Sequence, residues 1–325
     1  MSISRRNLIA GAGGVSLGAL ASPTSAQAAP TPARGGHGTR GRFARMSWLG
    51  TSGWRIKTPS TTLLVDPYLS RFDTGLAAGR FNPMTPLSTD SAAIDHALGA
   101  AGTRAGAVDA ILVTHTHWDH FADVPHIART RGGTVFSTLT GYHLAQALDV
   151  PTKQLAVLRG AEELHVGDVV VRAVRSLHSR TGSGGLLFPG LHVQAPPRPE
   201  SIADLPEGDT LAFLVRSPTG RSVLLMGASD FDDQALVGLS PDVVAMPVPS
   251  NDVTAHYVSR LMKALNHPRL VVPVHWDHFE SPLTNPPTTS AGMAARRDAM
   301  VDEVRRCSPR TKVLLPGYLD PLWLL

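Results

Sequence analysis

The chain has 325 residues, of which 42% are hydrophobic and 17% charged, so it can bury a large core and is not a disordered polymer. Its formal charge is only +4, from 30 basic and 26 acidic side chains. No run of Lys and Arg with interleaved aromatic residues occurs, so we expect no nucleic-acid partner. The single cysteine, Cys307, excludes an intrachain disulfide and a thiolate zinc cluster.

The first 28 residues have the pattern of an export signal. The segment Ser4–Ile9 contains a twin-arginine pair, and a Gly-, Ala- and Leu-rich stretch follows it up to Leu20. This stretch is too short and too glycine-rich for a membrane span, which needs about 20 apolar residues. We therefore expect a twin-arginine signal peptide over residues 1–28, the twin-arginine export machinery as a partner, and a periplasmic or extracellular protein. We expect no stable transmembrane span in the mature form.

The rest of the chain alternates strands and helices without a second break. Residues 29–42 are rich in Pro, Gly and Arg and are predicted to be a linker, which leaves residues 43–325 as one domain. Short β-branched or Leu-rich runs bounded by Gly, Pro, Asp or Asn predict strands. The expected strands are Arg45–Trp48, Thr61–Val65, Ala110–Val113, Thr134–Phe136, Val169–Val174, Leu211–Val215, Val223–Met226, Val243–Ala245 and Leu270–Val274. The expected helices are Phe121–Arg129, Leu139–Leu148, Thr254–Leu265 and Ala291–Arg306.

The order of these elements bears on the fold class. Strands dominate the early part of the domain, helices are interspersed, and no repeat period is present. This order favours an α/β fold in which two sheets pack face to face with helices outside, a four-layer αβ/βα sandwich. Propensity alone does not separate this fold from a doubly wound sheet.

One motif carries chemistry. The predicted strand Ala110–Val113 ends in Thr114-His115-Thr116-His117-Trp118-Asp119-His120. Side chains two apart on extended backbone point the same way, so His115 and His117 can converge on one ion. If the chain then turns into a helix, Asp119 and His120 swing toward a second ion. Imidazole and carboxylate groups are the ligands that zinc, iron and manganese take in proteins.

This His-x-His-x-Asp-His pattern after an apolar strand resembles the signature of the metallo-β-lactamase superfamily, and the likeness extends over about Arg45 to Leu315. The resemblance implies the sandwich fold, a two-metal centre, and three further ligands at the ends of later strands: a His, a bridging Asp and a final His. The chain offers His178, Asp230 and His275 at such places. The resemblance thus implies one ion held by His115, His117 and His178, a second held by Asp119, His120 and His275, and Asp230 between them.

Each ligand candidate outside the motif has an alternative. These are His165 for His178, His278 for His275, and Ser229 or Asp232 for Asp230. The last case arises because the superfamily usually shows Gly-Asp here, whereas this chain has Gly227-Ala228-Ser229-Asp230. A bridging Asp230 would favour the phosphodiesterase and lactonase groups over the β-lactamases, which usually lack it.

Two upstream segments refine the resemblance. Trp48–Gly53 and Leu64–Tyr68 resemble the opening of the branch that includes L-ascorbate-6-phosphate lactonase-like enzymes, although that branch commonly has His where Thr51 stands. Asp66 has two interpretations. Its carboxylate either accepts a hydrogen bond from a ligand histidine and fixes its tautomer, or simply initiates a turn before Pro67.

The resemblance implies a metal-dependent hydrolase in which a hydroxide shared by two divalent ions cleaves a phosphodiester, lactone or related ester or amide bond of a small-molecule or lipid-like substrate. Zinc is the first expectation for both ions, with manganese or iron as alternatives. Asp119 and His120 are the candidate catalytic residues, and His192 and His278 are candidate proton donors.

Three points stay open. The Gly- and Pro-rich segment 179–196 is either a substrate lid or an ordinary surface loop. The first alternative function is an iron-dependent redox enzyme on the same fold. The second is a non-catalytic exported metal-binding protein, in which protein groups would close every coordination position, whereas catalytic sites keep one open.

Overall fold

The computed structural model describes residues 44–323. The predicted signal peptide and linker lie outside these residues. Within the described range, no helix combines the length and the apolar character that crossing a bilayer requires.

Two mixed β-sheets form the centre of the domain. The first sheet has the strand order β15 (Pro321–Trp323), β1 (Arg45–Trp48), β2 (Trp54–Lys57), β3 (Thr62–Val65), β4 (Ala110–Leu112), β5 (Thr134–Ser137) and β6 (Leu155–Val157). The second has the order β11 (Asp230–Phe231), β8 (Val169–Leu177), β9 (Thr210–Arg216), β10 (Ser222–Met226), β12 (Val243–Pro247), β13 (Leu270–Val274) and β14 (Lys312–Val313), and β7 (Glu163–Val166) pairs with β8.

Successive side chains along the strands of the first sheet point to its two opposite faces, and each face packs against a different apolar core. In β3, Leu63 and Val65 belong to the core between the sheets, whereas Leu64 belongs to the core under the helices. In β4, Ala110 and Ile111 divide in the same way. Because successive side chains of a strand point to opposite faces, an uninterrupted apolar strand must be covered on both sides.

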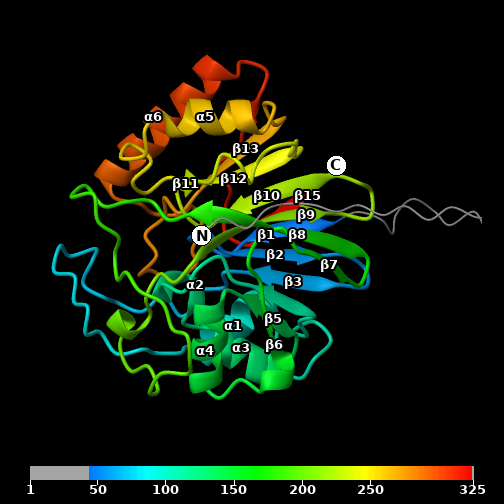
Figure 1. The fold of residues 1–325 in the computed structure, drawn as a ribbon, viewed down its shortest axis with the longest axis vertical. Coiled ribbons are helices and arrows are strands. Elements are labelled where there is room, and N and C mark those ends of the chain that lie inside the picture. Colours follow the sequence, from blue (N-terminus) through cyan, green and yellow to red (C-terminus); the bar gives the residue numbers. More distant parts are fainter. Residues whose placement is uncertain (1–43, 324–325) are drawn as a thin grey trace, which may run out of the picture. The chain divides into compact units, whose positions relative to one another are not determined.

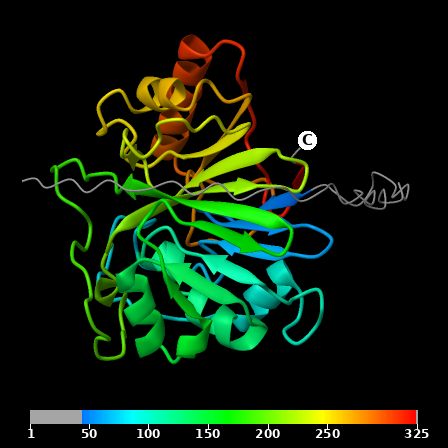
Figure 2. The ribbon, with the colours of Figure 1, turned by 45° about the vertical axis from the view of Figure 1, so that its right-hand side comes forward.

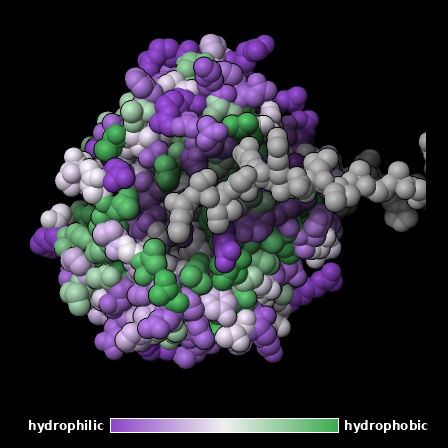
Figure 3. All heavy atoms as spheres, viewed as in Figure 1, coloured by the Kyte–Doolittle hydropathy of each residue, from purple (hydrophilic) through white to green (hydrophobic). Residues whose placement is uncertain are grey.

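Helices cover the outer faces, and Figures 1 and 2 show them on both sides of the paired sheets. The helices of the N-terminal half are α1 (Ser91–Leu98), α2 (Trp118–Phe121), α3 (Val124–Arg131) and α4 (Leu139–Ala147). The C-terminal half supplies α5 (Tyr257–Ala264) and α6 (Ala291–Cys307), and short 3₁₀ turns lie at Thr152–Gln154 and Ile202–Asp204. On the face shown in Figure 3, hydrophilic side chains cover most of the region of α5 and α6. The predicted four-layer sandwich is confirmed.

One predicted helix is divided in the structure. Residues 121–129 were expected to form a single helix, but α2 ends at Phe121 and α3 begins at Val124. Between them, the buried Asp123 carboxylate accepts hydrogen bonds from the backbone amides of Leu69 and Ser70 at 2.6 and 2.7 Å. Pro125 then lies in the first turn of α3, where its missing N–H costs no helical hydrogen bond. The break leaves α2 as a short helix that carries Asp119 and His120 of the His-x-His-x-Asp-His motif.

Candidate metal centre

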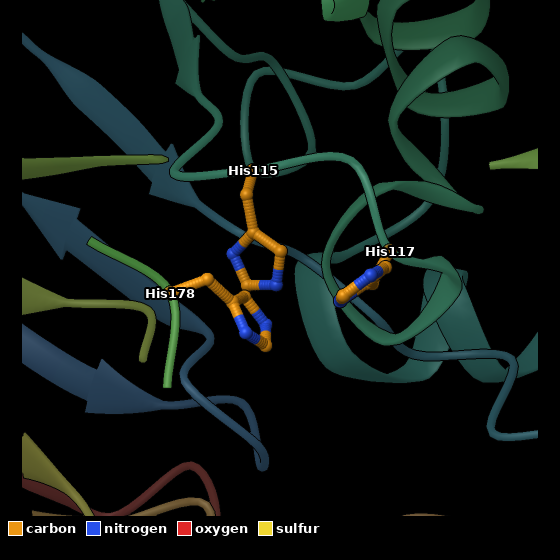
Figure 4. A group of neighbouring side chains, drawn as sticks. All are labelled: His115, His117 and His178. Carbon is orange, nitrogen blue, oxygen red and sulfur yellow. The ribbon is translucent and has the colours of Figure 1, made fainter. Parts of the chain in front are cut away.

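Three histidines from two distant parts of the chain form the first ligand group. His115 and His117 follow β4, and His178 follows β8. Their ring centroids lie 4.9, 4.7 and 4.7 Å apart in the three pairs, and each offers a nitrogen within 4.8 Å of the others. Figure 4 shows the rings converging on a common space.

Hydrogen bonds orient each of these rings. In each case the nitrogen directed away from the group meets an oxygen acceptor: Thr114 Oγ1 at 3.1 Å from His115 Nδ1, Leu187 O at 2.8 Å from His117 Nε2, and Ser179 O at 2.7 Å from His178 Nδ1. A carbonyl oxygen can only accept, so His117 Nε2 and His178 Nδ1 carry the hydrogens and their opposite nitrogens keep their lone pairs. His115 Nε2 is buried and has no hydrogen-bond partner among the described residues. The group therefore fits a cation.

Asp119, His120 and His275 form the second ligand group. Asp119 Oδ2 lies 3.0 Å from His275 Nε2 and 3.5 Å from His120 Nε2. The His120 and His115 rings, whose centroids are 4.0 Å apart, place the two groups side by side. Two imidazoles and a carboxylate are a ligand set suited to zinc, iron or manganese.

Asp66 lies behind the second group. Its Oδ2 accepts a hydrogen bond from His120 Nδ1 at 2.8 Å and another from the Thr114 hydroxyl at 2.5 Å, while Oδ1 accepts from the Thr114 amide at 2.8 Å. The Thr114 hydroxyl therefore has its hydrogen on Asp66 and can accept from His115. Of the two interpretations of Asp66, the structure shows the hydrogen bond to His120, a candidate ligand. One carboxylate thus orients a ring in each group.

Gly227, at the end of β10, permits this arrangement. A Cβ atom at this position would lie 2.0 Å from Thr114 Oγ1 and 3.2 Å from His115 Nδ1. Any side chain here would push Thr114 and His115 out of place, so the glycine lets the two sheets approach each other beside the site.

The two groups differ in their electrostatics. Burial and the neighbouring imidazoles hold the pKa of His115 well below its usual range, and they lower the pKa of His117 to about 3 and that of His178 to about 4. Burial also opposes a charge on His120, but the Asp119 and Asp66 carboxylates outweigh it and raise the pKa of this residue. Burial opposes ionisation of Asp119 too, yet His120 and His275 lower the pKa of its carboxyl. The first group is neutral and the second attracts positive charge.

A cavity of about 230 Å³ contains all six ligand side chains in its lining. Its other walls are largely apolar, including Trp118, Leu187 and Phe279. Leu187 comes from the segment 179–196, whose residues Ser179, Arg180 and Thr181 also line the cavity. This segment therefore borders the site.

Asp230 is the one predicted ligand that the structure does not bring to the centre. In β11 it pairs with Leu177 of β8, whose side chain is exposed. Side chains directly opposite each other on neighbouring strands share a face, so Asp230 is directed away from the metal cavity and lines two other hollows. The residue after Gly227 in the cavity wall is Ala228. The preference for phosphodiesterases and lactonases that rested on Asp230 therefore lapses.

The alternative ligands are placed as follows. His165 lies on β7 with 73% of its side chain exposed, and neither His278 nor Asp232 belongs to a ligand group. Ser229 does line the cavity, but its hydroxyl donates to the Pro249 carbonyl. His192, a candidate proton donor, lines a separate hollow.

Sequence reasoning missed four contributors to the site. The carbonyl of Leu187 has no sequence signal, because any residue could supply it. Phe279 and Trp118 are apolar residues beside ligands, and their place in the cavity wall depends on how the loops fold. Asp277 follows the ligand His275 by two residues, which is the signal that could have drawn attention to it.

A four-layer sandwich with histidine and aspartate ligand groups at one edge defines the class of metallo-β-lactamase-fold proteins. A family model described as "Beta-lactamase superfamily domain" matches residues 45–275, and the chain belongs to this family.

Curated relatives agree with this assignment, and a solved structure has a similar fold. The chain is 27% identical over 283 residues to a UPF0173 metal-dependent hydrolase of Polynucleobacter asymbioticus, covering 84% of this chain and 86% of that protein. A second such protein, from Cupriavidus necator, is 28% identical over 272 residues, or 80% and 82% of the two chains. The fold is similar to that of the metallo-beta-lactamase fold protein YhfI from Bacillus subtilis, with a TM-score of 0.54 at 12% identity over 87% of this chain and 99% of that one.

Proposed function

We propose that this protein is a metal-dependent hydrolase whose centre takes two divalent cations, one in each ligand group. The observation that carries the proposal is the orientation of the imidazoles. In His115, His117, His178 and His120, the nitrogen directed away from the group meets an oxygen acceptor, which leaves the other nitrogen free to bind a cation. The UPF0173 relatives are named as metal-dependent hydrolases, which supports the same function.

When bound, two such ions would polarise the bond to be cleaved and lower the pKa of a water molecule toward neutrality. The chain's own residues would supply orientation. The ionised Asp119 carboxylate lies against both His120 and His275, where it can hold a hydrogen of the attacking water. Trp118, Leu187 and Phe279 would exclude bulk water and receive an apolar part of the substrate.

The substrate class is a small phosphodiester, a lactone or a related ester or amide. The opening segments Trp48–Gly53 and Leu64–Tyr68 support a place in the branch of L-ascorbate-6-phosphate lactonase-like enzymes, which favours the lactone. A small lipid-like substrate also suits the apolar walls of the cavity.

The test is a panel of chromogenic phosphodiester, lactone and β-lactam substrates, combined with metal analysis. We expect metal-dependent turnover of a phosphodiester or lactone that His115→Ala reduces by at least about 100-fold, because even the loss of a residue that only supports a ligand costs about 10–100-fold. The exposed His165→Ala serves as the matched control and should keep full activity. Full turnover in metal-stripped protein would contradict the proposal.

Other results would favour the alternative functions. One iron per chain with oxygen consumption would indicate the redox enzyme. Tight metal binding without turnover of any substrate, and without a coordination position open to an added anion, would indicate a non-catalytic metal-binding protein.

We also propose that the protein is exported by the twin-arginine route, on the evidence of Arg5 and Arg6 and the apolar stretch that follows them. The double substitution Arg5→Lys and Arg6→Lys should retain the protein inside the producing cell, as fractionation would show. Unchanged export of this variant would contradict the proposal.

A further inference from the structure

The second ligand group depends on two residues in an unfavourable backbone conformation. His275 has φ 61° and Thr51 has φ 51°, in the left-handed region that residues other than glycine rarely adopt. A β-branched residue such as Thr51 is especially disfavoured there. Strain of this kind persists only where the surroundings enforce it, and it concentrates at functional sites.

A chain of hydrogen bonds enforces these two conformations. The His275 amide donates to the Thr51 carbonyl at 2.9 Å, and the Trp48 indole donates to the same oxygen at 3.0 Å. The Thr51 amide in turn donates to Asp277 Oδ1 at 3.0 Å. Both polar groups of the Thr51 backbone are therefore in use. One of them contacts the ligand His275, and the other contacts Asp277.

The second carboxylate oxygen of Asp277, Oδ2, has two partners. It lies 2.7 Å from Arg71 Nη2 and accepts the hydroxyl of Tyr318 at 2.9 Å. The side chains of Arg71 and Asp277 are 2% and 0% exposed, so this is a fully buried ion pair. Arg71 also donates to the carbonyls of His278 and Ser281, which fixes the loop after His275. Gly50 makes room for the guanidinium, because a Cβ there would lie 2.2 Å from Arg71 Nη1.

A buried ion pair is a poor source of stability, because removing two charges from water costs about as much as their attraction returns. The pair is instead connected to the strained ligand His275 through Thr51. Within the described residues, none of the three histidines of the first group has a positive φ.

We propose that Asp277, charge-paired with Arg71, is the positioning residue of the second ligand group. Asp277 touches none of the ligand atoms. It acts through Thr51 to keep His275 Nε2 against Asp119, and so it sets the affinity of the second group for its cation without affecting the first. The inference rests on the proposed function, since it assumes that the second group binds a cation.

The experiment is a stepwise titration of metal-stripped protein with Co²⁺, followed by visible absorption, together with the thermal midpoint of each metal-stripped variant. We call the uptake at each ligand group its step, the first step being the one that His178→Ala removes and the second the one that His275→Ala removes. In Asp277→Ala we expect the second step to weaken by about 10–100-fold, as found for residues that support metal ligands, while the first step stays within about twofold. Tyr318→Phe removes one hydrogen bond to Asp277 and leaves both charges, so the second step should weaken less.

Asp242→Ala is the matched control. Asp242 forms a 2.7 Å ion pair with Arg221 beside the start of β10, whereas the metal cavity lies at the end of that strand. This variant should leave both steps unchanged.

The outcomes separate the inference from the proposed function. If the wild-type protein takes up no second equivalent, the two-ion function fails and the inference falls with it. If the wild type takes up two ions and Asp277→Ala binds both as tightly, only the inference is overturned. Equal weakening of both steps would also overturn it, because it would show a role in folding alone. If Asp277→Ala does not fold, Tyr318→Phe decides: an unchanged ratio of the two steps contradicts the inference.

Discussion

The two ligand groups are adjacent but are built differently. The first consists of three neutral imidazoles placed by the ends of β4 and β8, with carbonyl and hydroxyl oxygens behind them. The second adds the Asp119 carboxylate and has the Asp66 carboxylate behind His120. Its third member, His275, adopts a left-handed conformation. The first group is thus oriented by neutral hydrogen-bond acceptors, and the second by buried charges and local strain. The two should respond differently to substitution and to pH.

The largest effect should come from Asp66→Asn. This change weakens the acceptor behind His120 and the Thr114 hydroxyl, so the second ion should bind about 10–100-fold more weakly, with a smaller effect on the first. Calorimetric titration of metal-stripped protein with Zn²⁺ measures both. Asp168→Asn is the control, because Asp168 also accepts two threonine hydroxyls, from Thr58 and Thr61, but lies in the β7–β8 turn. A first ion weakened more than the second would contradict the comparison.

The second prediction is that the two ligand groups contribute differently to the pH dependence of stability. The folded-state pKa values of His117 and His178, about 3 and about 4, lie below the unfolded value near 6.5. Their contribution is therefore complete above pH 6.5 and is lost as the pH falls toward 4, at no more than about 1.4 kcal/mol per pH unit for each group. The contribution of His120 to stability has the opposite pH dependence. Because its pKa is raised, this contribution is present in acid and is lost as the pH rises through the raised pKa.

Urea unfolding of metal-stripped protein between pH 7 and 4 would measure this dependence. His178→Gln should flatten the loss of stability in acid, whereas the exposed His165→Gln should not. An identical slope in His178→Gln and the wild type would contradict the assignment of the lowered pKa to this ring.

The smallest of the three effects should come from Ala228→Asp. Ala228 lines the cavity beside Gly227, where the superfamily usually carries an aspartate. A carboxylate there should tighten the second ion by about tenfold, the lower end of what an opposite charge within about 4–6 Å does to an ionisation constant. Ala228→Asn is the control, because it adds a side chain of similar size without the negative charge. Competition with a chelator measures the affinity, and an unchanged affinity in Ala228→Asp would show that this position does not face the second group.

Much of the fold was predictable from patterns within short segments. The strands that carry the ligands are continuous apolar runs that end in polar residues, and the His-x-His-x-Asp-His motif needed no tertiary information. The short strands β7 and β11 were missed because they form only through pairing with β8. The helix break at Asp123 was missed because it depends on contacts with Leu69 and Ser70, more than 50 residues away.

The residues of the site divide in the same way, into those that local patterns predict and those that depend on tertiary contacts. Of the six side chains that the structure gathers, four came from the motif, and His178 and His275 came from the resemblance to the metallo-β-lactamase superfamily together with their places at strand ends. Asp230 was misplaced because its direction depends on its register against β8, where it faces the exposed Leu177. The roles of Arg71 and Asp277 arise from packing between residues about 200 positions apart, which no local pattern records.

The central claim is that two distinct groups each hold one cation, and metal stoichiometry tests it most directly. Elemental analysis of protein equilibrated with excess Zn²⁺ and then desalted should give two ions per chain for the wild type and one for His178→Ala or His275→Ala. A wild-type value of one, unchanged in His275→Ala, would contradict the account.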